Sequence, residues 1–338
     1  MKKSVRLADI AERLQVSTVT VSNALAGQKG VSEELRSKIK KTAREMGYRT
    51  KAEYETEGKK ILNMGVIISE MYLGDYPSYY WKVYQELSLL AGNYHCIIIF
   101  EILRHEMEQG KVLPLFVQEK KVQGVFVIGE VDNAYLNFLY QKADIPMMLL
   151  DFMKRDLPVP AVLADNFYGM YKMVNYLIRK GHGRIAYVGT LKASNSIMDR
   201  YFGYCKALLE HGITVRPEWV IDDRSMDGQV GNIRLPEDMP TAFACNSDLT
   251  AAEVIGQLER QNYAVPGDIS VVGFDNYLYE GLCDVRVTSY QVDVREMVRS
   301  GIKSMASQIL YGKTPADLRF VSGRLVEKDS VAEVKSMG

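Results

Sequence analysis

Small hydrogen-bonding side chains gather near the start of this 338-residue chain, in the segment STVTVSN at residues 17–23. Ser17 is a natural N-cap for a short helix that runs to about Leu25. The side chains expected to point outward from the first turns of that helix are Thr18, Val19, Thr20 and Asn23. Small exposed side chains at the start of a helix suit the major groove of DNA. The chemistry that they suggest is therefore the reading of base edges.

Three short helices must position this segment. The first has an apolar face at helical spacing, formed by Leu7, Ile10, Ala11 and Leu14. The second packs back on the first through Val16, Val21, Ala24 and Leu25. Ser32 caps a third helix, which buries Leu35, Ile39, Ala43 and Met46 and stops at Gly47. Two short helices joined by a tight turn predict a helix-turn-helix head.

Charge argues against the alternative, a helical bundle with a purely structural role. Residues 1–50 hold eleven Lys and Arg and five Asp and Glu, a net charge of +6. The whole chain balances 42 basic against 42 acidic residues, so the remainder carries −6. A basic head on an acidic body indicates a nucleic-acid binder, because phosphate contacts supply most of the affinity.

The head resembles the N-terminal domain of the LacI/GalR family of bacterial transcription regulators, in the run DIAERLQVSTVTVSNALAGQKGVSEELRSKIKKTAREMGYR. The resemblance implies DNA contacts by Ser17, Thr18, Val19, Thr20, Ser22, Asn23, Ser32 and Tyr48. Two positions depart from the family pattern. Gln15 stands where the family often has Gly, and Asn23 where it usually has Arg. Asn reads adenine whereas Arg prefers guanine, so we expect a different operator base there.

The rest of the chain alternates short apolar runs with amphipathic stretches. Strands are expected near 64–68, 95–100, 124–128, 146–150, 161–163, 184–188, 241–245, 269–273 and 286–289. Helices are expected near 79–90, 133–142, 167–179, 201–211, 249–261 and 294–310. Near-continuous Val, Ile and Leu strands separated by helices predict α/β architecture with parallel sheets covered on both faces. Such sheets bind ligands at the carboxyl ends of their strands.

This body also resembles the family, whose effector domain is shared with periplasmic sugar-binding proteins and has two α/β lobes. The matching segments are 146–151, 162–189, 199–213, 240–255 and 265–276. We therefore expect a helix-turn-helix domain at 1–49, a hinge at 50–61 and an effector-binding and dimerisation domain at 62–330. Within the latter, lobe one should take about 62–160 and 290–320, and lobe two about 161–289.

The resemblance also assigns candidate effector contacts. Arg200 lies in the family's R-x-x-G pattern, which ends at Gly203, and commonly holds a ligand hydroxyl or carboxylate there. Asp275, Asn246 and Asp151 follow predicted strands and should emerge at the interlobe cleft. The alternatives are a surface position for Arg200 and helix capping for the aspartates.

Two further contacts come from positions that vary in the family. Tyr79 stands in PSYY, where relatives often have an Asn-Pro-aromatic motif, and could stack on a sugar ring or simply pack. Arg224 falls where many relatives place an aromatic wall.

The implied function is a repressor of a carbohydrate-utilisation operon. A homodimer would bind a pseudo-palindromic operator on double-stranded DNA, and a small polar effector, a sugar or sugar phosphate, would alter that affinity. The alternatives are a cleft that binds a nucleoside or a protein corepressor. Walker, HExxH and GxSxG motifs are absent from the sequence, so we expect neither an enzyme nor a cofactor. The stretch GHGRIA at 181–186 matches a dinucleotide loop but should be a helix C-terminal turn, because a helix precedes it.

The linker at 49–60, RTKAEYETEGKK, departs from the family's hinge helix, which inserts a Leu into the minor groove. It contains three glutamates and no Leu; Ala52 and Tyr54 are its candidate hinge residues, and Tyr54 is the one plausible wedge. We expect a flexible tether and little DNA bending, the alternative being a hinge that folds around Tyr54. The chain opens with no signal peptide, lacks a membrane-length apolar run and has four dispersed cysteines, which predicts a cytoplasmic protein with reduced thiols.

Overall fold

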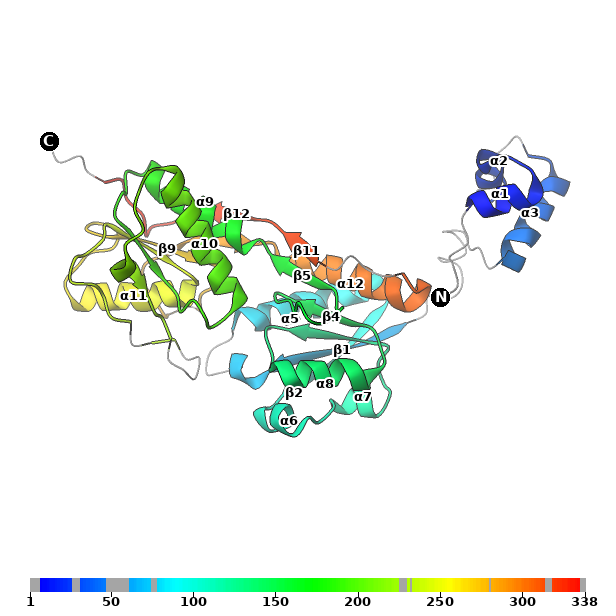
Figure 1. Ribbon diagram of the computed structural model, residues 1–338, viewed down its shortest axis with the longest axis horizontal. Helices are drawn as coiled ribbons and strands as arrows, with labels where there is room; N and C mark the ends of the chain where they lie inside the picture. Colours follow the sequence, from blue (N-terminus) through cyan, green and yellow to red (C-terminus); the bar gives the residue numbers. More distant parts are fainter. Residues whose placement is uncertain are drawn as a thin grey trace. The chain divides into compact units, whose positions relative to one another are not determined.

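The computed structural model describes residues 7–25, 31–46, 61–73, 78–224, 230–231, 233–279, 281–313 and 318–334. They belong to two units, Met1–Ile61 and Leu62–Gly338 (Figure 1). The predicted roles of Gly47, Tyr48, Ala52 and Tyr54 fall outside the described residues.

The N-terminal unit is the predicted three-helix head, with α1 at Leu7–Leu14, α2 at Thr18–Leu25 and α3 at Glu33–Met46. Its small core is formed by Ile10, Ala11, Val21, Ala24, Ile39 and Ala43. The Thr20 amide donates to the Ser17 hydroxyl at 3.0 Å, which confirms the predicted cap of α2. The Leu35 amide donates to Ser32 at 3.3 Å, so the third helix is capped as expected.

The turn between α1 and α2 has a left-handed backbone at Gln15, with φ +53°. The amide of Val16 donates to the Ala11 carbonyl at 3.0 Å and closes the turn. A side chain in this conformation costs about 1–2 kcal/mol, which Gly avoids. The departure from the family's glycine therefore falls at a position whose geometry favours glycine.

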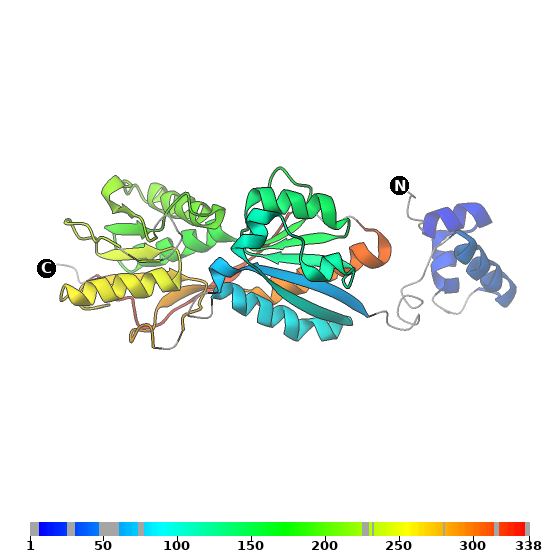
Figure 2. The same cartoon turned by 90° about the horizontal axis from the view of Figure 1, so that it is seen from below.

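The first lobe of the larger unit is built on a parallel six-stranded sheet, in the order β11-β5-β4-β3-β1-β2. Its strands are β1 (Leu62–Ser69), β2 (Cys96–Leu103), β3 (Gly124–Ile128), β4 (Met147–Leu150), β5 (Ala161–Ala164) and β11 (Leu318–Val321). Helices α5 (Tyr79–Ala91) and α12 (Val294–Tyr311) pack together on one face of this sheet (Figure 2). The other face is covered by α7 (Leu115–Gln118) and α8 (Asn133–Ala143), and α6 (His105–Gly110) lies beside them.

The second lobe has a six-stranded sheet in the order β12-β10-β9-β8-β6-β7. Its strands are β6 (Ile185–Val188), β7 (Val220–Ile221), β8 (Ala242–Cys245), β9 (Ser270–Phe274), β10 (Thr288–Val292) and β12 (Gly323–Val326). Helices α9 (Asn166–Arg179) and α10 (Asn195–Glu210) cover one face and α11 (Asp248–Arg260) covers the other (Figure 1). The α/β fold with parallel sheets was predicted, except that β12 pairs antiparallel with β10.

Edge strands account for most of what the apolar pattern missed. β7 has two residues, and three of the four residues of β11 are exposed, so neither forms a buried apolar run. The start of α10 was also missed, because its first two residues, Asn195 and Ser196, are polar and only Ile197 and Met198 follow as apolar residues before Asp199 and Arg200. Ser194 caps it by accepting from the Ile197 amide at 3.2 Å.

Three short segments carry the chain between the sheets, at Asp165 after β5, at Asp293 after β10 and at Ser322 between β11 and β12. The sequence predicted that residues 161–164 belong to lobe two. They form β5, which pairs with β4 and β11 and therefore belongs to lobe one. The chain also returns to lobe two after Val321, because β12 pairs with β10. The expected turn at 181–186 is present, with Gly181 at φ +92° after α9 and before β6. Among the described helices, none is both long enough and apolar enough to cross a membrane.

Candidate effector site and DNA-reading helix

Arg200 is a buried residue of α10, which excludes the surface alternative, since only 5% of it is exposed. Its Nε donates to Asn166 Oδ1 at 2.8 Å and one terminal nitrogen donates to the Asn246 carbonyl. The other terminal nitrogen lies 3.2 Å from Asp275 Oδ1. The guanidinium stacks on Phe274, 3.9 Å from the ring centroid. A buried charge needs such partners to offset its lost hydration, so the local fold is organised around this side chain.

Two strand-end aspartates approach Arg200 from different lobes. Asp151 follows β4 in the first lobe and Asp275 follows β9 in the second, and both are buried. Their backbones are left-handed, with φ +68° and +90°, and their amides donate to Val162 and Tyr290 of neighbouring strands. Such conformations are unfavourable for Asp and persist where the surrounding structure imposes them. The fold thus holds two carboxyl groups at the ends of two sheets.

The two carboxyl groups compete for one guanidinium. Burial raises the pKa of Asp151 to about 7, with Arg200 opposing the rise and Asp275 adding to it. Burial also raises the pKa of Asp275, although Arg200 and Lys82 oppose it. One buried cation between two buried acids leaves part of their charge uncompensated. The site therefore has spare hydrogen-bond acceptors.

Tyr79 adds a hydroxyl to the same cluster from the first turn of α5, in the first lobe. The hydroxyl is buried and has no hydrogen-bond partner among the described residues. Burial raises its pKa well above the usual value, and the charges of Asp151 and Asp275 raise it further. A buried hydroxyl without a partner is unfavourable, so a ligand that hydrogen-bonds to it would gain affinity. The Tyr79 ring meets Tyr80 edge-on, with 5.7 Å between centroids.

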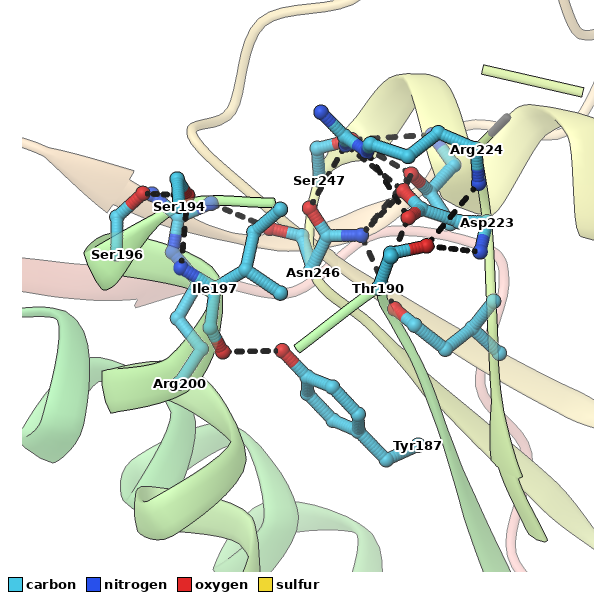
Figure 3. Close-up of polar contacts among 12 residues, drawn as sticks. Tyr187, Thr190, Ser194, Ser196, Ile197, Arg200, Asp223, Arg224, Asn246 and Ser247 are labelled. Atoms are coloured by element: carbon cyan, nitrogen blue, oxygen red, sulfur yellow. Dashed lines mark hydrogen bonds and ion pairs between the residues drawn. The ribbon is translucent and has the colours of Figure 1, made fainter. Parts of the chain in front are cut away.

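Asn246 and Arg224 belong to a neighbouring network inside the second lobe (Figure 3). The Asn246 amide nitrogen donates to Asp223 Oδ2 at 2.6 Å and to Val188 O at 3.1 Å. Arg224 donates to both oxygens of Asp223, at 3.0 and 2.8 Å. The side chain of Asn246 is thus bound within the lobe, and it is its backbone carbonyl that contacts Arg200. Both residues remain only predicted effector contacts, and their observed role is to support the site.

Sequence reasoning missed two buried acids of the second lobe, Asp223 in this network and Asp248 outside it. Asp223 is fully buried, and although burial alone would raise its pKa, hydrogen bonds from Arg224, Thr190 and Thr250 hold the pKa well below its usual range. Asp248, the first residue of α11, is 1% exposed, and burial raises its pKa to about 7. Their neighbours gave a signal, since Asp223 directly precedes Arg224 and Asp248 lies two residues after Asn246.

The proposed DNA-reading side chains lie on the surface of the head unit. Exposed members of the set are Ser17, Thr18, Val19, Ser22 and Ser32, with Val19 65% exposed, while Thr20 and Asn23 are half-buried. The Thr20 hydroxyl lies 2.8 Å from that of Ser17, so it supports the cap. Arg36 of α3 donates to the Ala24 carbonyl at 3.1 Å and ties α3 to the end of α2. These contacts fix the orientation in which α2 presents its first turns.

Comparison with known proteins agrees with both parts of this description. Residues 6–51 match the family of bacterial regulatory proteins of the lacI type, and residues 174–331 match the periplasmic binding protein-like domain. The chain thus carries a LacI-family helix-turn-helix domain and a periplasmic-binding-protein-like domain. Its relatives include the HTH-type transcriptional repressor CytR of Escherichia coli K12, 27% identical over 312 residues, which are 90% of this chain and 89% of CytR.

Other similar proteins match the chain over nearly its full length. The HTH-type transcriptional repressor PurR of Pectobacterium atrosepticum is 26% identical over 338 residues, which are 97% of each protein. A structure described as the lac repressor dimer bound to operator and the anti-inducer ONPF shares the fold, with a TM-score of 0.64 and 21% identity. The match covers 98% of this chain and 100% of that one. The chain is thus a DNA-binding transcription regulator with a periplasmic-binding-protein-like body.

Proposed function

We propose that this regulator is a homodimeric repressor whose affinity for operator DNA is set by a small polar effector bound between the two lobes. One observation carries the proposal. Arg200 forms an ion pair with Asp275 of its own lobe and interacts electrostatically with Asp151 of the other lobe. A ligand that hydrogen-bonds to these groups would contact both lobes at once. Binding would then favour one arrangement of the lobes over another, which is what an allosteric effector requires.

On the DNA side, the proposal assigns base contacts to Thr18, Val19 and Asn23. One short helix covers only a few base pairs, so two heads related by a two-fold axis would supply the affinity and the half-site spacing. The related lac repressor structure, a dimer with operator and an anti-inducer, supports this arrangement. Since its target would be operator DNA, we propose that the protein works in the cytoplasm, by binding and not by catalysis.

A thermal-shift screen of sugars, sugar phosphates and nucleosides with the full-length chain tests the effector half of the proposal. A ligand that binds only the folded state raises Tm in a concentration-dependent way. We expect at least one compound to do so, and the same compound to change the affinity of the chain for its operator. A screen without a shift, from a chain that still binds DNA, would favour a protein corepressor instead.

A further inference from the structure

The two arginines of this region, buried Arg200 and half-buried Arg224, each have a carboxylate of their own. Arg200 lies 3.2 Å from Asp275, and Arg224 donates to both oxygens of Asp223. All three nitrogens of the Arg200 guanidinium have an acceptor within the protein. The charge of each of these two arginines is therefore already balanced by a carboxylate of the protein.

Asp151 forms no ion pair among the described residues. It is 5% exposed, and its only hydrogen-bond donor among the described residues is the Ala164 amide, at 3.4 Å. It follows β4 of the first lobe, and its charge acts on Tyr79, Tyr80 and Arg200, so the carboxyl group belongs to the interlobe cluster.

The neighbouring charges reinforce this excess of acid. Glu130, from the first lobe, accepts from the Asn195 amide of the second lobe at 3.3 Å and adds its charge to the surroundings of Asp151. Two lysines lie in the surroundings: Lys82, whose charge acts on Asp275, lies over the Tyr277 ring, 5.3 Å from its centroid, and Lys154 pairs with Asp156 at 4.0 Å.

We propose that Asp151 determines effector specificity by rejecting phosphorylated compounds and selecting uncharged ligands rich in hydroxyl or amino groups. This inference rests on the proposed effector function. Above its pKa of about 7 the Asp151 carboxylate only accepts hydrogen bonds, as does a phosphate dianion, so in that range the two repel and share no proton. A hydroxyl or amino group donates to Asp151, and its neighbour on the same ring accepts from Arg200 or the Tyr79 hydroxyl. The sugar phosphates suggested by the sequence are thereby excluded from the site.

Matched pairs of compounds test the inference, using the full-length chain and calorimetric titration at about pH 8.5, where Asp151 is ionised. The pairs are ribose and ribose 5-phosphate, glucose and glucose 6-phosphate, adenosine and adenosine 5′-monophosphate, and cytidine and cytidine 5′-monophosphate. For any pair that binds, we expect the phosphorylated member to bind about 100-fold more weakly, because juxtaposed like charges are strongly unfavourable. A phosphorylated member that binds as tightly as its partner would overturn the inference and leave the proposed function standing.

An isosteric variant separates charge from shape. Asp151→Asn should reduce the discrimination within a pair to about tenfold or less, because the repulsion goes while the size of the side chain stays. Asp144→Asn is the matched control, since Asp144 is exposed at the end of α8 in the same lobe, and it should leave the ratio unchanged. If Asp151→Asn discriminates between the two members of a pair as strongly as the unsubstituted chain does, Asp151 does not determine this specificity. If no compound of the panel binds the unsubstituted chain, the proposed effector function fails, and this inference fails with it.

Discussion

Two arginine–aspartate pairs lie side by side in the second lobe and differ in what surrounds the acid. Asp223, beside Arg224, accepts from the Thr190 amide at 2.9 Å, from Asn246 at 2.6 Å and from Thr250 at 2.7 Å, besides the two bonds from Arg224. Asp275, beside Arg200, has one side-chain contact at 3.2 Å, and Asp151 lies nearby. Both are arginine–aspartate pairs, but the carboxylate of Asp223 has many hydrogen-bond donors and that of Asp275 has few.

The pKa values follow this difference in donors. The pKa of Asp223 is held well below its usual range despite burial, whereas burial raises the pKa of Asp275. A saturated buried pair fixes local structure, while an undersupplied one is ready to accept bonds from a ligand. We therefore expect mutations at the first pair to affect folding and mutations at the second to affect binding.

The largest expected effect is on folding. Asp223→Ala should destabilise the unit Leu62–Gly338 by about 3–5 kcal/mol, because removal of one partner leaves Arg224, Asn246 and Thr250 without their shared acceptor. Denaturant unfolding of the full-length chain measures this. Asp222→Ala is the control, since Asp222 is exposed and adjacent. Similar stability for the two variants would show that the network is not structural.

The second effect is on ligand binding. Arg200→Ala should weaken binding of whichever compound gives the largest thermal shift by more than about tenfold, because buried groups lose their partner. Operator binding without ligand should stay unchanged. Arg260→Ala serves as a control, since this arginine is 61% exposed in the same lobe. Equal ligand affinities for the Arg200 variant and the unsubstituted chain would refute the site.

A third test uses pH and Asp248, which has a pKa of about 7. A raised pKa in an acid gives stability that is fully present below the unfolded value near 3.8 and is lost as pH rises through 7. Between pH 5 and 8 the unsubstituted chain should therefore lose more Tm than Asp248→Asn, by roughly 2–4 °C for each kcal/mol of difference. Asp223, whose pKa is lowered, contributes no change in this window. Parallel Tm curves for the two proteins would contradict the assigned shift.

The smallest expected effect concerns a strained residue away from both pairs. Gln15 has a left-handed backbone, as Asp151 and Asp275 do, but it is not a proposed effector contact. Gln15→Gly should stabilise the head by about 0.5–1 kcal/mol, since relief of about 1–2 kcal/mol is partly offset by the greater freedom of unfolded Gly. Thermal unfolding of the head domain, compared between the two proteins, measures this change in stability. A destabilised variant would show that the Gln15 side chain contributes contacts of its own.

Local pattern was sufficient to predict the head and most of the body. The helical spacing around Ile10 and Val21 and the buried runs such as Met64 to Ile68 depend only on nearby residues. Arg200 was found through a motif that has a fixed position in the fold. Asn246 was placed at the correct strand end, but the direction of its side chain depends on Asp223, which lies 23 residues away in sequence. The network around Asp223 could not be predicted, because long-range packing and not local spacing brings its members together.

The most direct test of the account is selection of bound duplexes from a random pool by the full-length chain, with and without the compound that shifts Tm most. We predict an inverted-repeat motif whose recovery changes with ligand. Asn23→Ala should lose preference at one symmetric base position, at a cost of about 1–3 kcal/mol. Recovery of duplexes without a symmetric motif, or of a motif that the ligand does not affect, would contradict the account.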